Sequence, residues 1–340
     1  MSHFSVAVFT QNEGKTVEEL LAPFHEFECT GTVDEHVQSI DQLQEAMEEY
    51  KAYKFTRYKA PNGKLYEAYA DEFYREPTEE ELKQIGILGG SGCGNGLSWA
   101  SKDWGDGKGY QTKIHFLPEG YEEVSVNAPE IMSLREFIEY YYSRETLTEG
   151  ETPDVHGKHM WGWLRVNEAG EVIELINRTN PNAKWDWWVE GGRYGGFLLV
   201  KSEQAGSYPE AWNCSGREAI EGHAWVNSAK LSYIQWELLE QVDREKRAVY
   251  WEEAQEKSDV EKYFCYGIKK DMTKDEYINK GSEFGTFAVV WPDGHWYEKG
   301  QMGWWAAVAN EDEAWDENYK ERFLDKADPE WRLTIVDCHI

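Results

Sequence analysis

The segment from Asn180 to Gly196 holds the densest group of residues that could do chemistry. Three tryptophans, an aspartate and an arginine stand within nine positions, bracketed by glycines. A guanidinium beside aromatic rings can hold a carboxylate or phosphate through two parallel hydrogen bonds, or stack on the rings. Glycine permits left-handed backbone angles and close approach by a ligand. The candidate residues for binding a ligand or partner are Trp185, Asp186, Trp187, Gly191, Gly192, Arg193 and Tyr194.

The same segment also has a purely structural interpretation. It could be a tight corner in which Asp186 neutralises Arg193 while the tryptophans fill the core, and both interpretations stay open. It is not a phosphate-binding loop, because the Gly-x-x-x-x-Gly-Lys-Ser/Thr spacing is absent. The glycine cluster Gly89–Gly96 fails the same test and is expected to be irregular. Its Cys93 would be a nucleophile only with a base nearby, and most solitary cysteines are packing residues.

A second group of reactive side chains is the run Asp337, Cys338 and His339. Successive residues of a strand point to opposite faces, so Asp337 and His339 can share a face that Cys338 does not. A pair of this kind is more often structural than catalytic. Asp337 and His339 join the candidate site, as does Trp304 from the aromatic segment Gly300–Trp305.

The remaining motifs argue against metal and cofactor chemistry. The histidines are scattered without a His-Glu-x-x-His spacing, and no Cys-x-x-Cys pair occurs. The sequence therefore predicts no metal site and no cofactor. Carboxylates are so numerous that no pair stands out as acid and base, because shifted pKa values and geometry identify such pairs. Enzymatic activity is left open and is not the favoured interpretation.

Charge limits the classes of partner. The 340 residues include 64 acidic and 35 basic side chains, which gives a formal net charge of −29. Such a chain is repelled by phosphate backbones and by anionic membranes, so direct binding to nucleic acid or membrane is not expected. The acidity either serves solubility or lets the surface compete with nucleic acid for a basic partner.

Targeting signals and cysteine usage indicate a compartment. No stretch approaches the ~20 consecutive apolar residues of a membrane span, and the start does not resemble a signal peptide. The five cysteines are odd in number and widely spaced. This pattern is typical of a reducing cytosol and not of a disulfide framework.

Local patterns predict the elements that must position these residues. Capping boxes, which mark helix starts, are expected at Thr16, Ser39, Thr78, Ser133, Ser258 and Thr273. Alternating or apolar runs predict strands at 4–10, 112–117, 161–166, 172–176, 197–201, 286–291 and 333–338. An apolar stripe predicts one long helix near 229–255.

Strands and helices interleave without regular alternation, which predicts an α+β fold with mixed, mainly antiparallel sheets and flanking helices. The exposed-looking loop at 144–158 suggests an N-terminal region 1–150 and a C-terminal region 151–340. The sequence leaves open whether these regions form one domain.

Six stretches of the chain together carry a resemblance to a known family. They are Met1–Val8, Glu19–Glu26, Asn180–Trp188 with Gly191–Tyr194, Asp293–Trp296, Gly300–Trp305 and Thr334–Ile340. This set resembles a family of uncharacterised bacteriophage and prophage proteins with a Trp-Asp-Trp-[Tyr/Trp]-x-x-Gly-Gly-Arg-[Trp/Tyr] motif and a Val-Asp-Cys-His-Ile end. At His25, Trp188 and Tyr194 the chain carries residues other than the family's usual ones, which are Asp, Tyr and Trp. The resemblance implies a setting in the cytoplasm of a bacterial host and supplies no mechanism.

Two functions follow as hypotheses. The favoured one is a phage-type accessory protein that binds a host protein or complex, such as a defence protein, and inhibits or redirects it; self-association is left open. The alternative is an enzyme or sequestering protein for a nucleotide-like or other phosphorylated ligand, with Arg193 as anion clamp and Trp185 or Trp187 as stacking platform. Either site would be compact, so Trp187, Trp304 and Asp337 should lie within about 13 Å, the radius of a 100-residue domain.

Overall fold

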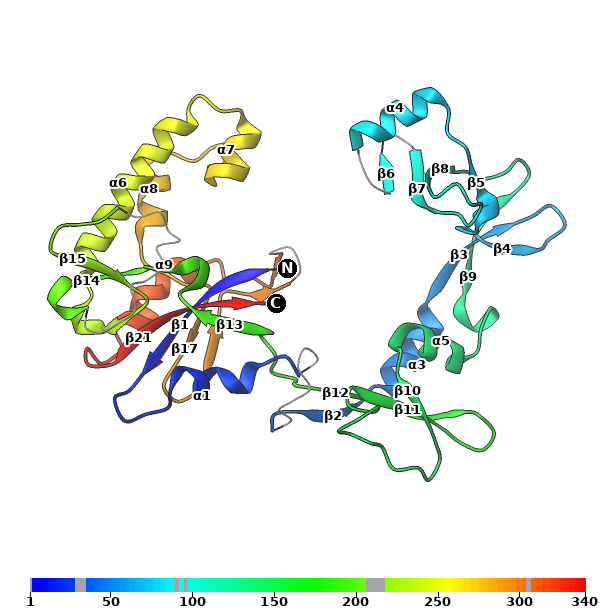
Figure 1. Cartoon of the computed structure of the whole chain (residues 1–340), viewed down its shortest axis with the longest axis horizontal. Coiled ribbons are helices and arrows are strands. Elements are labelled where there is room, and N and C mark those ends of the chain that lie inside the picture. Colours follow the sequence, from blue (N-terminus) through cyan, green and yellow to red (C-terminus); the bar gives the residue numbers. More distant parts are fainter. Residues whose placement is uncertain (1, 28–34, 89–91, 95–96, 206–217, 304–306) are drawn as a thin grey trace. The chain divides into compact units, whose positions relative to one another are not determined.

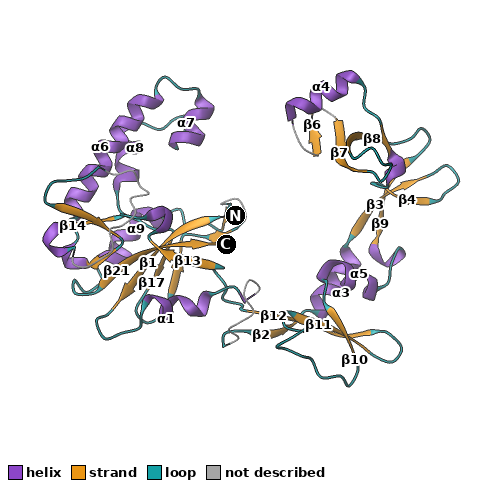
Figure 2. Ribbon diagram, in the orientation of Figure 1, coloured by secondary structure: helices purple, strands orange, loops and turns teal. Residues whose placement is uncertain are grey.

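The computed structural model describes residues 2–27, 35–88, 92–94, 97–205, 218–303 and 307–340 (Figure 1). Helices and strands are mixed and most strand pairs are antiparallel, which confirms the predicted α+β class (Figure 2). The chain divides into two compact units. Unit 1 comprises Met1–Gln38 and Thr179–Ile340, and unit 2 comprises Ser39–Arg178.

Unit 2 is thus an insertion into unit 1, and the units do not follow the expected division at residue 150. The segment 144–158, predicted to be a loop, lies inside unit 2, and its residues Glu145–Thr148 form strand β10 instead, which pairs in parallel with β11 (Gly162–Val166). Polar residues and glycine indicate that the chain turns. They do not show whether the turn lies between two domains or, as here, between two neighbouring strands of one sheet.

The core of unit 1 is a sheet with the order β13-β21-β1-β17-β18, and β16 also pairs with β21. Its strands are β1 (His3–Thr10), β13 (Trp187–Glu190), β16 (Ser228–Lys230), β17 (Ala288–Val290), β18 (Trp296–Glu298) and β21 (Arg332–His339). β1 pairs antiparallel with β21 over all eight of its residues and in parallel with β17. Both central strands are buried at every residue after the first, as is typical of strands covered on both sides.

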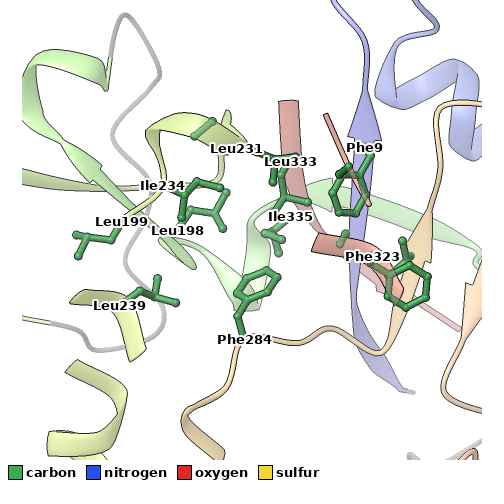
Figure 3. Close-up of a cluster of buried hydrophobic side chains, with 14 of the residues drawn as sticks. Phe9, Leu198, Leu199, Leu231, Ile234, Leu239, Phe284, Phe323, Leu333 and Ile335 are labelled. Carbon is green, nitrogen blue, oxygen red and sulfur yellow. The ribbon is translucent and has the colours of Figure 1, made fainter. Parts of the chain in front are cut away.

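Two apolar clusters cover the two faces of this sheet. Phe4, Val6, Val8 and Cys338 pack on one face with Leu20 of helix α1 (Val17–Leu21). The other face belongs to the larger cluster that Figure 3 shows, with Phe9, Leu333 and Ile335 from the sheet facing Leu239 and Phe323. The alternation along β1 and β21 therefore assigns each side chain to one of two cores.

The other elements of unit 1 surround this sheet. Its further helices are α6 (Trp236–Ala254), α7 (Asp259–Tyr266), α8 (Lys274–Ser282), α9 (Trp315–Tyr319) and a π-helical turn at Lys320–Leu324. Its further strands are β14 (Leu198–Lys201), β15 (His223–Val226), β19 (Gln301–Met302) and β20 (Val308–Ala309).

The long helix begins later than predicted. Residues 229–235 were expected to be helical, but Ser228–Lys230 pair with β21 and a 3-10 turn follows at Leu231–Tyr233. The apolar side chains of Ala229, Leu231 and Ile234 pack in the large cluster, so their spacing imitates a helical stripe. Tertiary packing thus overrides the local pattern.

The described residues of unit 2 form three small sheets and three α-helices. The sheets have the orders β10-β11-β12-β2, β4-β3-β9 and β5-β8-β7-β6. Their other strands are β2 (Gln38–Asp41), β3 (Lys54–Lys59), β4 (Leu65–Glu67), β5 (Tyr74–Arg75), β6 (Gly92–Gly94), β7 (Leu97–Asp103), β8 (Tyr110–His115), β9 (Glu122–Asn127) and β12 (Val172–Thr179). The helices are α3 (Leu43–Ala52), α4 (Glu79–Leu88) and α5 (Leu134–Tyr142).

Two local predictions in unit 2 need correction. The helix predicted to start at Ser39 starts at Leu43, because Gln38–Asp41 form β2 instead. The glycine cluster was expected to be irregular, yet Gly92–Gly94 pair with β7 as a strand. The remaining residues of that cluster, 89–91 and 95–96, lie outside the described residues.

Candidate functional site

Strand register brings the dispersed candidate residues into one place. His3 on β1 lies opposite His339 on β21, and Trp187 on β13 lies opposite the same His339. The next row on this face contains Ser5, Asp337 and Val189, two positions along each strand. Since alternate residues share a face, these rows form one continuous surface at the end of the sheet.

Two histidine–aspartate pairs lie side by side on this surface. Nδ1 of His339 is 2.6 Å from Oδ1 of Asp186, and Nδ1 of His3 is 2.9 Å from Oδ1 of Asp337. The two imidazole centroids are 4.9 Å apart at an interplanar angle of 74°. Two imidazoles, each oriented by its own carboxylate, are thus close enough to act on one bound group.

The carboxylate of Asp337 is buried and that of Asp186 is partly buried, and each accepts a second hydrogen bond. The side chain of Asp337 is 2% exposed, and its Oδ2 accepts a hydrogen bond of 2.9 Å from the backbone N–H of Arg193. Oδ1 of Asp186 also accepts from the backbone N–H of Trp187 at 2.7 Å. The second partner of each carboxylate is therefore a backbone amide of the segment that begins at Asp186, and buried carboxylates need such partners.

Two glycines let this segment pass over Asp337. Gly191 has φ 72° and Gly192 has φ 50°, in the left-handed region that side chains disfavour. A Cβ on Gly192 would lie 2.6 Å from both Cβ and Oδ2 of Asp337, and a Cβ on Gly191 would overlap the amide of Asn227. Gly192 is therefore required by its close approach to Asp337, and Gly191 by its close approach to Asn227.

The three tryptophans of the segment have different environments. Trp187 is 43% exposed and stacks on His339, with centroids 5.0 Å apart and an interplanar angle of 15°. Trp185 is buried on the opposite face of the sheet, where its Nε1 donates to the backbone oxygen of Leu21 and its ring stacks on His25. Of the two predicted stacking platforms, Trp187 is therefore the one that a ligand can reach.

Arg193 and Tyr194 flank the pairs. The Arg193 side chain is exposed, and Asp186 pairs with His339 instead of with Arg193, so the predicted neutralisation inside a corner is wrong. The Tyr194 hydroxyl donates to the backbone oxygen of His3 at 3.4 Å. Burial, and then the charge of Asp337, raise the pKa of Tyr194.

Trp304 lies outside the described residues, so its distance from Trp187 and Asp337 stays a prediction. Its described neighbour Gly303 accepts a hydrogen bond of 2.8 Å from the Ser2 hydroxyl, one residue before β1. Cys338 points away from its two neighbours into the opposite cluster, as strand alternation predicts. Burial raises the pKa of the Cys338 thiol, which makes it a poor nucleophile.

His3 is the functional residue that reasoning from spacing missed. It carries no local motif, and its partner Asp337 is 334 positions away. The one available signal was its place in Met1–Val8, the first of the stretches that carry the family resemblance. His25 is a further unexpected contact, since its Nε2 lies 3.1 Å from the backbone oxygen of Asp186.

Within the described ranges, no group of three or more His, Cys, Asp or Glu side chains is positioned to hold a metal ion. Because an ionised carboxylate only accepts, each imidazole Nδ1 carries the shared hydrogen, and each Nε2 is left as an acceptor when the ring is neutral. The side chains of His3 and His339 are 11% and 6% exposed, so a group in contact with them must reach a largely buried place.

No protein-family model, curated protein or solved structure matches the chain. Across the described part of the chain, no helix combines the length and the apolar character needed to cross a membrane. A functional assignment therefore rests on the geometry of the site.

Proposed function

We propose that unit 1 binds a small phosphorylated, nucleotide-like ligand at the β1–β21–β13 surface, and that His3 and His339 act on it as acid and base. The observation that supports this proposal is the pair of adjacent His–Asp contacts beside an exposed indole. A site that served packing alone would not need a ring with 43% exposure stacked on one of its imidazoles.

The chemistry requires two imidazoles in opposite protonation states. The neutral ring accepts a proton at Nε2 from an attacking water or hydroxyl, and the protonated ring donates its Nε2 proton to the leaving oxygen. The phosphorus–oxygen bond to the nucleophile forms as the bond to the leaving group breaks. General acid–base catalysis of this kind contributes about 10²–10⁴-fold in rate.

Binding relies on Trp187 and Arg193. The outer face of Trp187 offers a stacking platform, and stacking of a base on an aromatic side chain is worth about 1–3 kcal/mol. The Arg193 guanidinium can hold phosphate oxygens in a bidentate pair. In a chain of net charge −29, an exposed arginine whose backbone N–H bonds Asp337 of one of the two pairs is the basic group that we propose for the anion.

The test is a titration of the purified chain with nucleoside mono- and triphosphates, cyclic dinucleotides and inorganic phosphate, followed by calorimetry and by chromatography of products. We expect Trp187→Ala and Arg193→Ala each to weaken nucleotide binding at least 10-fold while the fold is retained. Arg135→Ala, which removes an exposed arginine of unit 2, is the matched control. Absence of nucleotide binding, or equal binding by all variants, would exclude the proposal.

A second candidate is a phage-type accessory protein that binds a host protein in the bacterial cytoplasm and inhibits or redirects it. The observation that favours it is the net charge of −29 combined with tyrosines that unit 2 exposes, namely Tyr110 (78%), Tyr140 (72%) and Tyr69 (67%). Tyrosines are common interface anchors, and an acidic surface suits a basic partner.

Affinity purification from a bacterial host at physiological salt tests this second candidate. A host protein that co-elutes in stoichiometric amount, and dissociates as salt rises, supports it. A clean protein, or one that co-elutes only with its own copies, speaks against it.

A further inference from the structure

Unit 1 contains a cavity of about 310 Å³ between α6, α8 and the connection that leads from α8 to β17. Its lining includes Phe197, Lys246, Arg247, Tyr250 and Phe284. The histidine–aspartate pairs and Trp187 are not part of this lining. The cavity therefore is a separate place from the β1–β21–β13 surface.

Arg247 is fixed at the wall of this cavity. Its Nε donates to the backbone oxygen of Tyr277 at 2.8 Å, and its Cζ lies 4.0 Å from the centroid of the Tyr277 ring. Gly281 makes room for it, because a Cβ at that position would overlap the guanidinium. Three features thus hold one side chain in one orientation.

This orientation leaves the terminal nitrogens of Arg247 for a ligand. Within the described part of the chain, the hydrogen bond through Nε is the one that the structure gives to this guanidinium. The two Nη groups form the fork that binds phosphate or carboxylate oxygens in parallel. An arginine whose Nε is hydrogen-bonded and whose guanidinium already packs on an aromatic ring loses little further conformational entropy when it binds an anion.

The rest of the lining selects what the anion is attached to. Phe197, Tyr250 and Phe284 contribute aromatic rings, and Figure 3 shows Phe284 among the core side chains. The lining also carries Asp243 and Glu283, which offset the charges of Lys246 and Arg247. A bare ion would gain little from such a balanced lining, whereas a planar ring would gain contact with aromatic walls.

We propose that this cavity binds a small organic anion, a phosphate or carboxylate carried on a planar ring, with Arg247 as its anion clamp. The volume of about 310 Å³ suits a ligand at the small end of the range for binding sites, which is about 300–1,000 Å³. The inference stands independently of the function proposed above.

Phenyl phosphate is the probe, with inorganic phosphate and phenol as its two halves. We expect calorimetry on the full chain to show phenyl phosphate binding more tightly than either half. Arg247→Gln and Arg247→Lys should each weaken it at least 10-fold, the latter because lysine lacks the fork. Arg244→Gln on the same helix, whose Nη1 bonds Asn279 instead, is the matched control and should bind normally.

Gly281→Ala keeps Arg247 but displaces its guanidinium, so we expect the same loss of binding. If Arg247 variants fail to fold, Tyr250→Ala at the partly exposed rim should still weaken phenyl phosphate and leave inorganic phosphate unchanged. Trp187→Ala should not affect this site, which separates it from the nucleotide site. Absence of phenyl phosphate binding, or equal binding by wild type, Arg247→Gln and Tyr250→Ala, would overturn the inference.

Discussion

Nδ1 of His339 lies 2.6 Å from Oδ1 of Asp186, although 153 positions of sequence separate the two residues. The indole of Trp187 covers the same imidazole. One contact thus fixes the edge strand β13, orients a potential acid or base, and supports the aromatic ring that we propose as a ligand platform.

His339→Ala should destabilise unit 1 by about 1–3 kcal/mol, because Asp186 would keep only its backbone partner in a largely buried place. Urea unfolding measured by tryptophan fluorescence checks this. Arg193→Ala removes an exposed side chain and should change stability by less than about 0.5 kcal/mol. The reverse order of the two effects would restore the interpretation of this segment as an Asp186–Arg193 corner.

Gly192→Ala should cost roughly 2–5 kcal/mol, since left-handed strain adds to overlap with Asp337. The matched control is Gly222→Ala at φ 73°, where nothing lies within 4 Å of the new Cβ. The control should show the strain alone, about 1–2 kcal/mol. Equal midpoints in urea for the two variants would mean that the close approach to Asp337 contributes nothing.

Replacing residues 39–178 by a short Gly-Ser linker should leave unit 1 folded. The chain passes out of and back into unit 1 at neighbouring points, because the Asn180 side chain donates to the backbone oxygens of Pro23 and His25 at 2.8 and 2.9 Å. Within unit 2, β2 and β12 are hydrogen-bonded neighbours as well. Near-ultraviolet circular dichroism and a cooperative melt would check the shortened chain, and a molten or aggregated product would contradict the prediction.

Acid should weaken unit 2 partly through Glu81. Two hydrogen bonds from Arg75, at 2.7 and 2.9 Å, and then the Thr78 N–H lower the pKa of Glu81 to about 2. A lowered pKa stabilises the fold above the ordinary value near 4.5, and this contribution disappears as pH falls towards 2. Glu81→Gln should therefore lower the melting temperature at pH 7, with a difference that shrinks below pH 4.5.

The exposed neighbour Glu80 provides the control for this titration. Glu80→Gln should leave the melting temperature and its pH dependence unchanged, since the structure gives Glu80 no such partner among the described residues. A pH-independent effect of Glu81→Gln would show that the ion pair with Arg75 is not responsible.

Sequence reasoning succeeded where the determining forces are local. The capping boxes at Ser133, Ser258 and Thr273 each start a helix at the next residue, because the cap and its glutamate are three positions apart. The shared face of Asp337 and His339 also followed from strand alternation alone.

Predictions from the sequence failed where pairing with a strand far away in the sequence determines the local structure. One of the two interpretations of the segment paired Asp186 with the nearby Arg193, whereas the register of β13 on β21 places it beside His339. His3 was not foreseen as a partner of Asp337, because no local pattern reports which strands become neighbours. Ser39 and Ala229 were placed in helices for the same reason, since each pairs or packs within a sheet region instead.

The pairing of β1 with β21 has a consequence for biosynthesis. His3 and His339 are opposite each other in the sheet, yet a ribosome that adds about 5–20 residues per second needs roughly 20–70 s to travel from one to the other. Residues 39–178 are contiguous and can fold during that interval, while β1 waits without its main partner. We expect the nascent chain to bring His3 and His339 together only after β21 leaves the exit tunnel, so no partly made chain carries the proposed site.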